Sequence, residues 1–269
     1  MAGHAPPGPT IRAWRPAVAG VAEVLHATFP EHAYPAHTHD TWTLLLVDSG
    51  TVRYDLERHE HGALGDRVTL LPPHVPHDGR SVEETGFRKR VVYLEEETIG
   101  AALVGAAVDH PGWVDPVLRG QVHDLHAALD RPGDRFEAEV RVALLCDGLR
   151  RRLAGATEPP VVRRDRPLAH RLRALLDADV VEGLTLTAAA ASLGAHPAHL
   201  VRAFGAEYGI PPHRYLTGRR LDRARRLLLA GSRPADVAVA VGFHDQAHLT
   251  RHFRRLLGVT PAAYARSAQ

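Results

Sequence analysis

A motif that the chain repeats at an offset of 49 residues constrains the fold most strongly. Residues 198–204 read AHLVRAF and residues 247–253 read AHLTRHF. Identity continues at three further pairs, Gly209/Gly258, Pro212/Pro261 and Tyr215/Tyr264, which gives eight identities in 18 aligned positions. Unrelated segments would share about one. A repeat of this size indicates two copies of one supersecondary unit.

Each copy has the pattern of a helix with one apolar and one polar face. Leu200 and Phe204 are four residues apart, so they share a face that can be buried, and Arg202 lies on the opposite face. Leu249, Phe253 and Arg251 repeat this arrangement in the second copy.

The segments before each helix complete a helix-turn-helix pattern. A short helix is expected at 187–193 before Gly194 and at 235–241 before Gly242, with Thr187 as a cap of the first. Pro197 suits a first helical position, and Asp245 suits the cap of the second long helix. A pair of ordinary helical hairpins is the alternative, and two copies with arginine at one face position disfavour it.

The distribution of charge points to a polyanionic partner for the C-terminal part. The 269 residues carry a formal net charge of +2. From residue 163 onward there are 17 Arg and 8 acids, a net of +9, whereas residues 1–162 carry 16 basic and 23 acidic residues, a net of −7. A basic segment beside an acidic one suggests that the basic segment binds a polyanion. Lys89 is the only lysine in the chain.

Other features of the composition favour a cytoplasmic protein with no membrane segment. Cys146 is the only cysteine, so no internal disulfide framework is expected and a reducing compartment fits. No run of 18 apolar residues occurs, and the N-terminus lacks the apolar core of a signal peptide.

Residues 34–94 have the pattern of a small β sandwich or barrel. Short apolar or alternating runs at 42–47, 51–56, 68–71 and 87–94 are separated by turn residues, with a further strand at 22–29 and a loop at 72–79. His37 and His39 are two residues apart, so on a strand they would point the same way. His74 and His77 follow in the loop.

This segment resembles the cupin family of double-stranded β-helix barrels. Its first motif, His-x-His followed by Glu and Gly, fits His37, His39 and Gly50, but Thr43 stands where the Glu would be. The second motif fits at Gly65, Pro72 and His77, with one extra residue in the gap and His74 in place of a glycine. The resemblance implies a metal site of three His and the Glu. Three imidazoles alone, His37, His39 and His77, could hold Zn²⁺ or a similar divalent ion. The alternative is that they are polar residues of a pocket without metal.

The chain then becomes helical, and the domains follow from the pattern. Helices are expected at 97–108, 115–129 and 134–153. In the last of them, Asp134 and Glu137 would form a capping pair. An apolar stripe on these helices could form a homodimer contact. The sequence predicts a two-domain α+β protein: a cupin-like barrel with helices at 1–153, a linker at 154–166, and an all-α domain at 167–269. In that domain a long helix at about 212–230 would join the two helix-turn-helix units at the roughly 34 Å spacing of successive major grooves.

The C-terminal 100 residues resemble the AraC/XylS family of bacterial transcription factors. The segment 238–264, AVAVGFHDQAHLTRHFRRLLGVTPAAY, carries the resemblance, and a cupin-type ligand-binding domain often precedes it in this family. By that resemblance, base-facing positions fall early in each recognition helix. They are Ala198, Val201 and Arg202 in the first and Gln246, Ala247, Thr250 and Arg251 in the second, with Arg254 and Arg255 on phosphates. Arg can pair with guanine, Gln with adenine, and Ala, Val or the Thr methyl group with thymine. Phosphate contact alone is the alternative for Arg202 and Arg251.

These features predict a ligand-responsive transcription regulator, more often an activator by family resemblance, that binds double-stranded DNA and RNA polymerase. A small molecule would bind in the barrel among His37, His39, Trp42, His77 and Tyr93. One alternative is a metal-dependent cupin enzyme fused to a DNA-binding domain, which the absence of the Glu at Thr43 and of an acid–base pair disfavours. The other is a constitutive DNA-binding protein whose barrel only dimerises.

Overall fold

The computed structural model describes residues 8–30, 33–57, 59–61, 66–83, 85–156 and 164–266. The chain divides into two compact units. The first contains residues 1–130 and 145–159, and the second contains residues 131–144 and 160–269. The units differ from the expected domains in one respect, because the start of the helix Arg135–Leu153 is grouped with the C-terminal residues. The expected linker at 154–166 lies partly outside the described residues.

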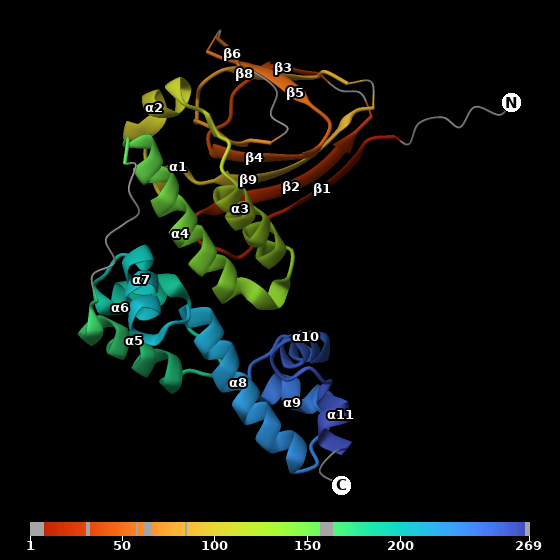
Figure 1. Ribbon diagram of the computed structural model, residues 1–269, viewed down its shortest axis with the longest axis vertical. Helices are drawn as coiled ribbons and strands as arrows, with labels where there is room; N and C mark the ends of the chain where they lie inside the picture. The colour runs from red at the N-terminus through yellow and green to blue at the C-terminus, as the bar shows by residue number, and fades with distance from the viewer. Residues whose placement is uncertain are drawn as a thin grey trace, which may run out of the picture. The chain divides into compact units, whose positions relative to one another are not determined.

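The first unit is built on two antiparallel sheets that face each other (Figure 1). Their strands are β1 (Thr10–Trp14), β2 (Val21–Phe29), β3 (Ala33–His37), β4 (Trp42–Ser49), β5 (Val52–Leu56), β6 (His59–His61), β7 (Val68–Leu71), β8 (His77–Ser81), β9 (Phe87–Leu94) and β10 (Gly112–Trp113). One sheet has the order β1-β2-β9-β4-β7-β10 and the other β3-β8-β5-β6. Without the outer strands β1 and β10, the eight strands from β2 to β9 have the order of a jelly roll. The predicted double-stranded β-helix is therefore confirmed.

Strand alternation decides which side chains lie between the sheets. Leu45 and Val47 of β4 belong to the apolar core between the sheets, together with residues of β2, β5 and β9. The intervening Trp42, Leu44 and Leu46 point to the other face, where they are fully buried as well. That second burial explains why β4 is almost continuously apolar rather than alternating.

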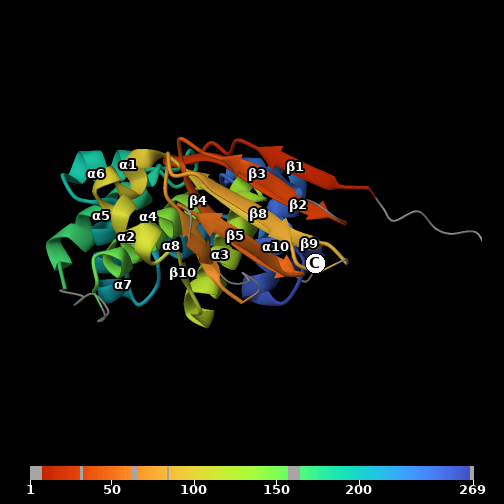
Figure 2. The ribbon, with the colours of Figure 1, turned by 90° about the horizontal axis from the view of Figure 1, so that it is seen from above.

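Five strands, β1, β3, β6, β8 and β10, are not among the strand segments expected from the sequence. β8 lies within the predicted loop at 72–79 and beyond it, and β1 covers a segment for which no strand was expected. The sequence of β8, HDGRS, has no strand propensity. It forms a strand because it is hydrogen-bonded between β3 and β5, and Figure 2 shows these three strands side by side.

Helices pack around the barrel of the first unit. They are α1 (Glu96–Ile99), η1 (Ala101–Leu103), α2 (Val104–Asp109), α3 (Pro116–Leu129) and residues 145–153 of α4 (Arg135–Leu153), with η2 (Pro132–Asp134) before α4 in the second unit. α3 contacts the outer face of the larger sheet, where His126 lies 3.2 Å from His26 of β2, whereas Val104 and Val108 of α2 pack against the core between the sheets. Asp115 caps α3 through the backbone N–H groups of Val117 and Leu118. The single helix expected at 97–108 is wrong. Gly100, at φ +100°, interrupts it in a conformation that continues neither flanking helix.

The second unit is helical and has two apolar cores. Its helices are α5 (Arg166–Ala178), α6 (Leu186–Leu193), α7 (Pro197–Tyr208), α8 (Pro212–Leu229), α9 (Pro234–Ala240), α10 (Gln246–Leu257) and α11 (Pro261–Arg266). Leu216 of α8 belongs to the core of α5, α6 and α7, whereas Leu221, Ala224 and Leu228 belong to the core of α9 and α10. Figure 1 shows α8 running from one group to the other. The long joining helix is therefore confirmed.

The turns and caps of both units follow the sequence with one correction. Gly194 and Gly242 have positive φ angles at the turns before α7 and α10. A Cβ on Gly242 would also lie 2.2 Å from the carbonyl oxygen of Val181, so only glycine fits there. Asp245 caps α10 as predicted. The cap of α6 is Thr185, whose hydroxyl accepts from Ala188 N–H, and not Thr187, because the helix begins one residue before Thr187.

Residues 131–144 pack against both helix-turn-helix groups. Val140 lies in the core of α5, α6 and α7, and Glu139 accepts a 2.6 Å hydrogen bond from the backbone N–H of Leu186. The predicted capping pair is wrong, because Glu137 bonds Arg141 on its own helix while Asp134 faces α10. Within the described residues, none of the helices combines the length and apolar character that a membrane span requires.

Candidate ligand cavity and nucleic-acid interface

The barrel encloses a cavity of about 120 Å³ between its two sheets. Its walls combine apolar and aromatic side chains with the polar groups of histidine, threonine, tyrosine, Asp78 and Lys89. The lining residues are Leu25, Tyr34, His37, His39, Thr43, Leu45, Val47, Val52, Tyr54, Thr69, Leu71, His77, Asp78, Gly79, Phe87, Lys89, Val91 and Tyr93. An apolar cavity with a small number of convergent polar groups is the usual form of a small-molecule site.

Three histidines converge on one wall of this cavity. The ring centroids of His37, His39 and His77 lie 4.5–5.1 Å apart, and one nitrogen of each lies within 4.8 Å of the others. Nδ1 of His37 is 2.7 Å from the carbonyl oxygen of Pro35, and Nδ1 of His77 is 3.1 Å from that of Val75. Since a carbonyl only accepts, both Nδ1 atoms carry the proton and both Nε2 lone pairs are free.

This arrangement fits a divalent metal ion. A backbone carbonyl that holds Nδ1–H is the support that metal-binding histidines usually have. Burial lowers the pKa of His77 to about 4, although the hydrogen bond that its Nδ1–H donates to the carbonyl oxygen of Val75 acts in the opposite direction. Burial and the neighbouring His37 lower the pKa of His39. Neutral imidazole is the form that binds a metal. The donor set lacks a carboxylate, because Thr43 lines the cavity where the cupin pattern has Glu.

The structure brings together four of the five predicted ligand residues. His37, His39, His77 and Tyr93 line the cavity, with the Tyr93 ring 5.2 Å from that of His39. Trp42 is corrected. It points to the opposite face of β4, where its indole N–H donates to the carbonyl oxygen of Glu96. Its neighbour Thr43 faces the cavity instead, since adjacent residues of a strand point to opposite faces.

On α7, the first of the two helices expected to read DNA, two predicted base-facing residues are corrected. Ala198 is 0% exposed and Val201 is 3% exposed, and Val201 belongs to the core with α5 and α6. Neither can reach a base without unfolding the unit. Arg202 is partly exposed, and His199 beside it lies 3.2 Å from Asp165. The polar face of α7 is therefore narrower than the sequence suggested.

The second helix expected to read DNA, α10, exposes most of the predicted residues. Leu249 and Phe253 are fully buried, and each contributes roughly 1.5–3 kcal/mol by that burial. The opposite face exposes four of the predicted contacts and partly exposes a fifth. Gln246, Ala247, Arg254 and Arg255 are exposed, and Thr250 is partly exposed. No carboxylate contacts any of the five among the ion pairs of the described residues.

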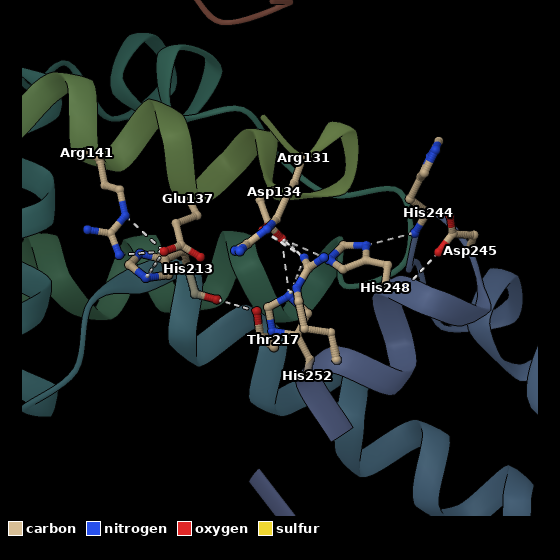
Figure 3. A network of polar contacts seen from close by, with 11 residues as sticks. Arg131, Asp134, Glu137, Arg141, His213, Thr217, His244, Asp245, His248 and His252 are labelled. Atoms are coloured by element: carbon tan, nitrogen blue, oxygen red, sulfur yellow. Dashed lines mark hydrogen bonds and ion pairs between the residues drawn. The ribbon is translucent and has the colours of Figure 1, made fainter. Parts of the chain in front are cut away.

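Arg251, the remaining predicted contact, is engaged within the second unit. Its guanidinium donates at 2.7 Å to both carboxylate oxygens of Asp134, which lies just before α4. His248 and His252 lie 3.0 and 3.2 Å from the same carboxylate, and Arg131 lies 3.8 Å away (Figure 3). The Asp134 side chain is 3% exposed, whereas that of Arg251 is 36% exposed.

The hydrogen-bond pattern makes this cluster an ion-pair network rather than a metal site. Nδ1 of His248 accepts from the backbone N–H of His244, so its proton sits on Nε2 and points to Asp134. A metal would need that Nε2 lone pair and would compete with Arg251 for the carboxylate. Burial would raise the pKa of Asp134, but the hydrogen bonds from His248 and His252 and the charge of Arg251 outweigh it and hold the pKa well below its usual range.

Sequence reasoning missed two residues that the structure places at these sites. Lys89 lines the cavity, and the only signal for it was that it is the single lysine. Asp134 contacts a residue 117 positions away, and no local pattern indicates such a contact.

Comparison with known proteins assigns both halves. An "AraC-like ligand binding domain" model matches residues 20–146, and a "Helix-turn-helix domain" model matches residues 189–267. The transcriptional regulator YbfI of Bacillus subtilis is 23% identical over 80% of this chain and 81% of its own length. The transcriptional activator RhaS of Salmonella arizonae is 26% identical over 86% of this chain and 87% of its own.

Two further matches cover a smaller part of this chain. The activator VirF of Yersinia enterocolitica is 29% identical, and the chain spans only 56% of its length. The crystal structure of the DNA-binding domain of AdpA in complex with a target DNA is 31% identical, with a TM-score of 0.34, and the match covers 38% of this chain and 91% of that one. The two matched domains, in this order and across most of the chain, show that the protein belongs to the AraC family of transcriptional regulators.

Proposed function

We propose that this protein binds specific double-stranded DNA through α7 and α10 and that a small molecule in the barrel cavity modulates this binding. The exposed face of α10 carries the proposal, because it presents donors and a methyl-bearing residue opposite a fully buried apolar face. Activation is the more frequent outcome expected from the family resemblance. RNA polymerase is the proposed partner at the promoter.

The proposed DNA contacts follow the chemistry of each exposed side chain. Gln246 would pair with adenine, and Ala247 and the Thr250 methyl group would contact thymine methyl groups. Arg202 would reach guanine from α7, and so would Arg251 from α10 once it leaves Asp134. Arg254 and Arg255 would bind phosphates. The burial of Ala198 and Val201 removes both from this set.

The barrel is proposed as the effector site, with room for a divalent ion. His37, His39 and His77 would hold the ion, and the ion would supply a Lewis-acidic anchor for a ligand oxygen. The effector must bind two arrangements of the protein with different affinity in order to change DNA occupancy. Metal analysis of protein purified without an affinity tag tests the metal site. If the protein contains no stoichiometric ion, the metal is removed from the proposal.

One experiment tests the regulator function with the full chain. Selection from random double-stranded DNA should yield a consensus, and the affinity for it should change when a metabolite found by thermal shift is added. Failure to enrich any consensus would contradict sequence-specific binding. A consensus with no metabolite effect would favour the constitutive alternative. Turnover of a bound metabolite in the presence of metal would favour the enzyme alternative, although the named relatives are regulators.

A homodimer is also proposed, through the helical part of the first unit. Val117 at the start of α3 is 68% exposed and Val114 before it is 60% exposed, so apolar area is available there. Light scattering at micromolar concentration, with and without DNA, checks this. A monomer under both conditions would contradict it.

A further inference from the structure

We propose that the effector of the barrel is a small organic carboxylate whose charge pairs with Lys89. This inference rests on the proposed function of the cavity as an effector site. It concerns only which chemical class the cavity selects.

Lys89 places a cation inside the cavity without a counter-ion. Its neighbours on β9, Arg88 and Arg90, point to the outer face and pair with Asp48, whereas Lys89 points inward. The ammonium nitrogen lies 4.0 Å from the ring centroid of Tyr34. Among the ion pairs of the described residues, none involves Lys89. The contact with the Tyr34 ring offsets only part of the lost hydration.

The carboxylate that lines the cavity is already committed elsewhere. Asp78 accepts a 2.8 Å hydrogen bond from the backbone N–H of Asp55, and its other oxygen lies 3.8 Å from Arg80. No other Asp or Glu appears among the lining residues in the described part of the chain. A bound anion would therefore meet one cation and little repulsion.

A buried cation without a partner is costly, because it has lost hydration that nothing replaces. Burial lowers the pKa of Lys89 to about 8, so the amine is still mostly protonated at pH 7. An entering carboxylate would replace the lost hydration by a charge-assisted hydrogen bond, which is about twice as strong as a neutral one. A neutral ligand of the same shape would leave the ammonium unpaired.

The volume of the cavity limits the size of the ligand, and the hydroxyl of Thr43 favours a second polar group on it. A cavity of about 150 Å³ is known to hold benzene, so the 120 Å³ here suits a compact body of similar or smaller size. Thr43 is 5% exposed, lines the cavity, and has no hydrogen-bond partner for its hydroxyl among the described residues. A hydroxyl or carbonyl oxygen on the ligand would satisfy it.

The test compares acids with their neutral amides. Butanoate, 3-hydroxybutanoate and pentanoate, each with its amide, are titrated into full-length protein freed of metal by chelation and, separately, loaded with Zn²⁺. Because Lys89 is the only lysine, ¹³Cε-labelled lysine gives a single resonance that reports on the site. We expect at least one acid to shift this resonance and to bind at least tenfold more tightly than its amide.

Two variants separate charge pairing from general binding. Lys89→Met keeps the apolar stem and should weaken acid binding at least tenfold. Arg88→Met, on the same strand with a side chain 60% exposed to solvent, is the matched control and should not. Amides that bind as well as acids, acids that still bind Lys89→Met, or no binding by any acid would each overturn the inference. If an acid binds the cavity but the affinity for the selected DNA does not change, the ligand-responsive function is contradicted. The inference that the cavity selects a carboxylate would still hold.

A second inference has an independent basis in the contacts of residues 131–134 with α10. We infer that these residues form a releasable clasp that withholds Arg251 from DNA. Asp134 occupies the guanidinium from a buried position, and the same guanidinium cannot also reach a base edge. Clasp closure and DNA contact by Arg251 therefore exclude each other.

The fit around Gly133 shows that the clasp is closely packed. A Cβ on Gly133 would lie 2.2 Å from Nδ1 of His248, so any other residue there would push the clasp and α10 apart. Residues 131–134 lead directly into α4, a single helix that also contributes residues 145–153 to the first unit. A displacement of α4 can therefore move residues 131–134, because the backbone is continuous between them.

Two unrelated substitutions should open the clasp. Asp134→Asn weakens the charge pairing with Arg251, and Gly133→Ala acts by steric exclusion. We expect each to raise the affinity of the full-length protein for its selected DNA at least threefold, and Arg251→Ala to cancel the gain. Glu137→Gln, one turn along α4 and bonded to Arg141, is the control and should have no such effect. Unchanged or reduced DNA affinity in both variants, with thermal unfolding still cooperative, would overturn the clasp.

Discussion

His126 shows how a single buried residue can couple stability to pH. It lies on α3 against the outer face of the larger sheet, with Nδ1 3.2 Å from Nε2 of His26. Its own Nε2 has no hydrogen-bond partner among the described residues. Burial, the nearby charge of Arg90 and the neighbouring His26 lower the pKa of His126 to about 3. The imidazole is therefore neutral in the folded protein at every pH above about 4.

This predicts that the protein loses stability on mild acidification. The unfolded chain binds a proton near pH 6.5 and the folded chain does not, so the free energy of unfolding should fall as pH drops from 6.5 toward 4. The slope for one such group is at most about 1.4 kcal/mol per pH unit. Urea unfolding at pH 7, 6 and 5 should show a shallower slope for His126→Leu than for the wild type. The exposed His110→Leu serves as control, and an equal slope in all three proteins would refute the assignment.

Glu139 is a second residue whose local chemistry has a measurable consequence. One carboxylate oxygen accepts from the N–H of Leu186 at 2.6 Å, and the other accepts from Arg135 at 2.9 Å. Glu139→Ala should cost about 1–3 kcal/mol in the free energy of unfolding, because the backbone N–H of Leu186 is left buried without an acceptor. Glu139→Gln should recover part of it. Arg135→Ala, at a side chain 52% exposed, should cost less than about 1 kcal/mol.

Among the helices, α7 and α10 share a motif but not a surface. Val201 of α7 sits in an apolar core that includes Val140 of α4, whereas the equivalent Thr250 of α10 is partly exposed. Ala198 is fully buried and its equivalent Ala247 is exposed. Helix periodicity alone cannot distinguish these cases, because burial depends on what packs against each helix. Under the proposed function, α10 would carry most of the base-specific hydrogen bonds.

The exposed residues of α10 should separate into two classes of effect. Gln246→Ala should cost about 1–3 kcal/mol in binding to the selected DNA and relax the preference at one base pair. Arg254→Ala should weaken selected and random DNA equally, as a phosphate contact does. Competition binding with single-base-pair variants of the selected DNA measures both. If Gln246→Ala weakened binding to all DNA sequences equally, Gln246 would be a contact to the DNA phosphate backbone instead.

For the whole molecule, the charge asymmetry predicts which unit should bind DNA. The residues from 163 onward, with a net charge of +9, all belong to the second unit, and the net charge of −7 of the preceding residues lies in the first. Nucleic acid should therefore be attracted to one unit and repelled by the other. α8, with 18 residues, is about 27 Å long and links the two helix-turn-helix groups. The expected 34 Å spacing of the recognition helices stays a prediction.

Salt should weaken DNA binding in proportion to the number of phosphates contacted. The logarithm of the association constant should fall linearly with the logarithm of salt concentration, by about 0.9 per phosphate. Replacing Arg254 and Arg255 together by Ala should reduce the slope by about 2. Arg53→Ala, exposed on the first unit, is the control. Binding isotherms from about 50 to 200 mM salt are the measurement, and an unchanged slope in the double variant would remove both residues from the interface.

Features that depend on local pattern could be predicted from the amino-acid sequence. The repeat at an offset of 49 predicted two helix-turn-helix groups, and the pairing of Leu249 with Phe253 predicted the buried face of α10, since helix periodicity fixes which residues share a face. Turn residues and short apolar runs predicted the barrel, and the strand order confirms it. His37, His39 and His77 were predicted as a group from a family pattern and lie together in the cavity.

The tertiary structure alone decided which side chains are available. Thr43 rather than Trp42 faces the cavity because a one-residue shift in strand register exchanges the two faces. Val201 is buried because a distant helix covers it. Asp134 holds Arg251 across 117 residues of sequence. Such contacts depend on how separate elements pack against one another, and local periodicity carries no information about that packing.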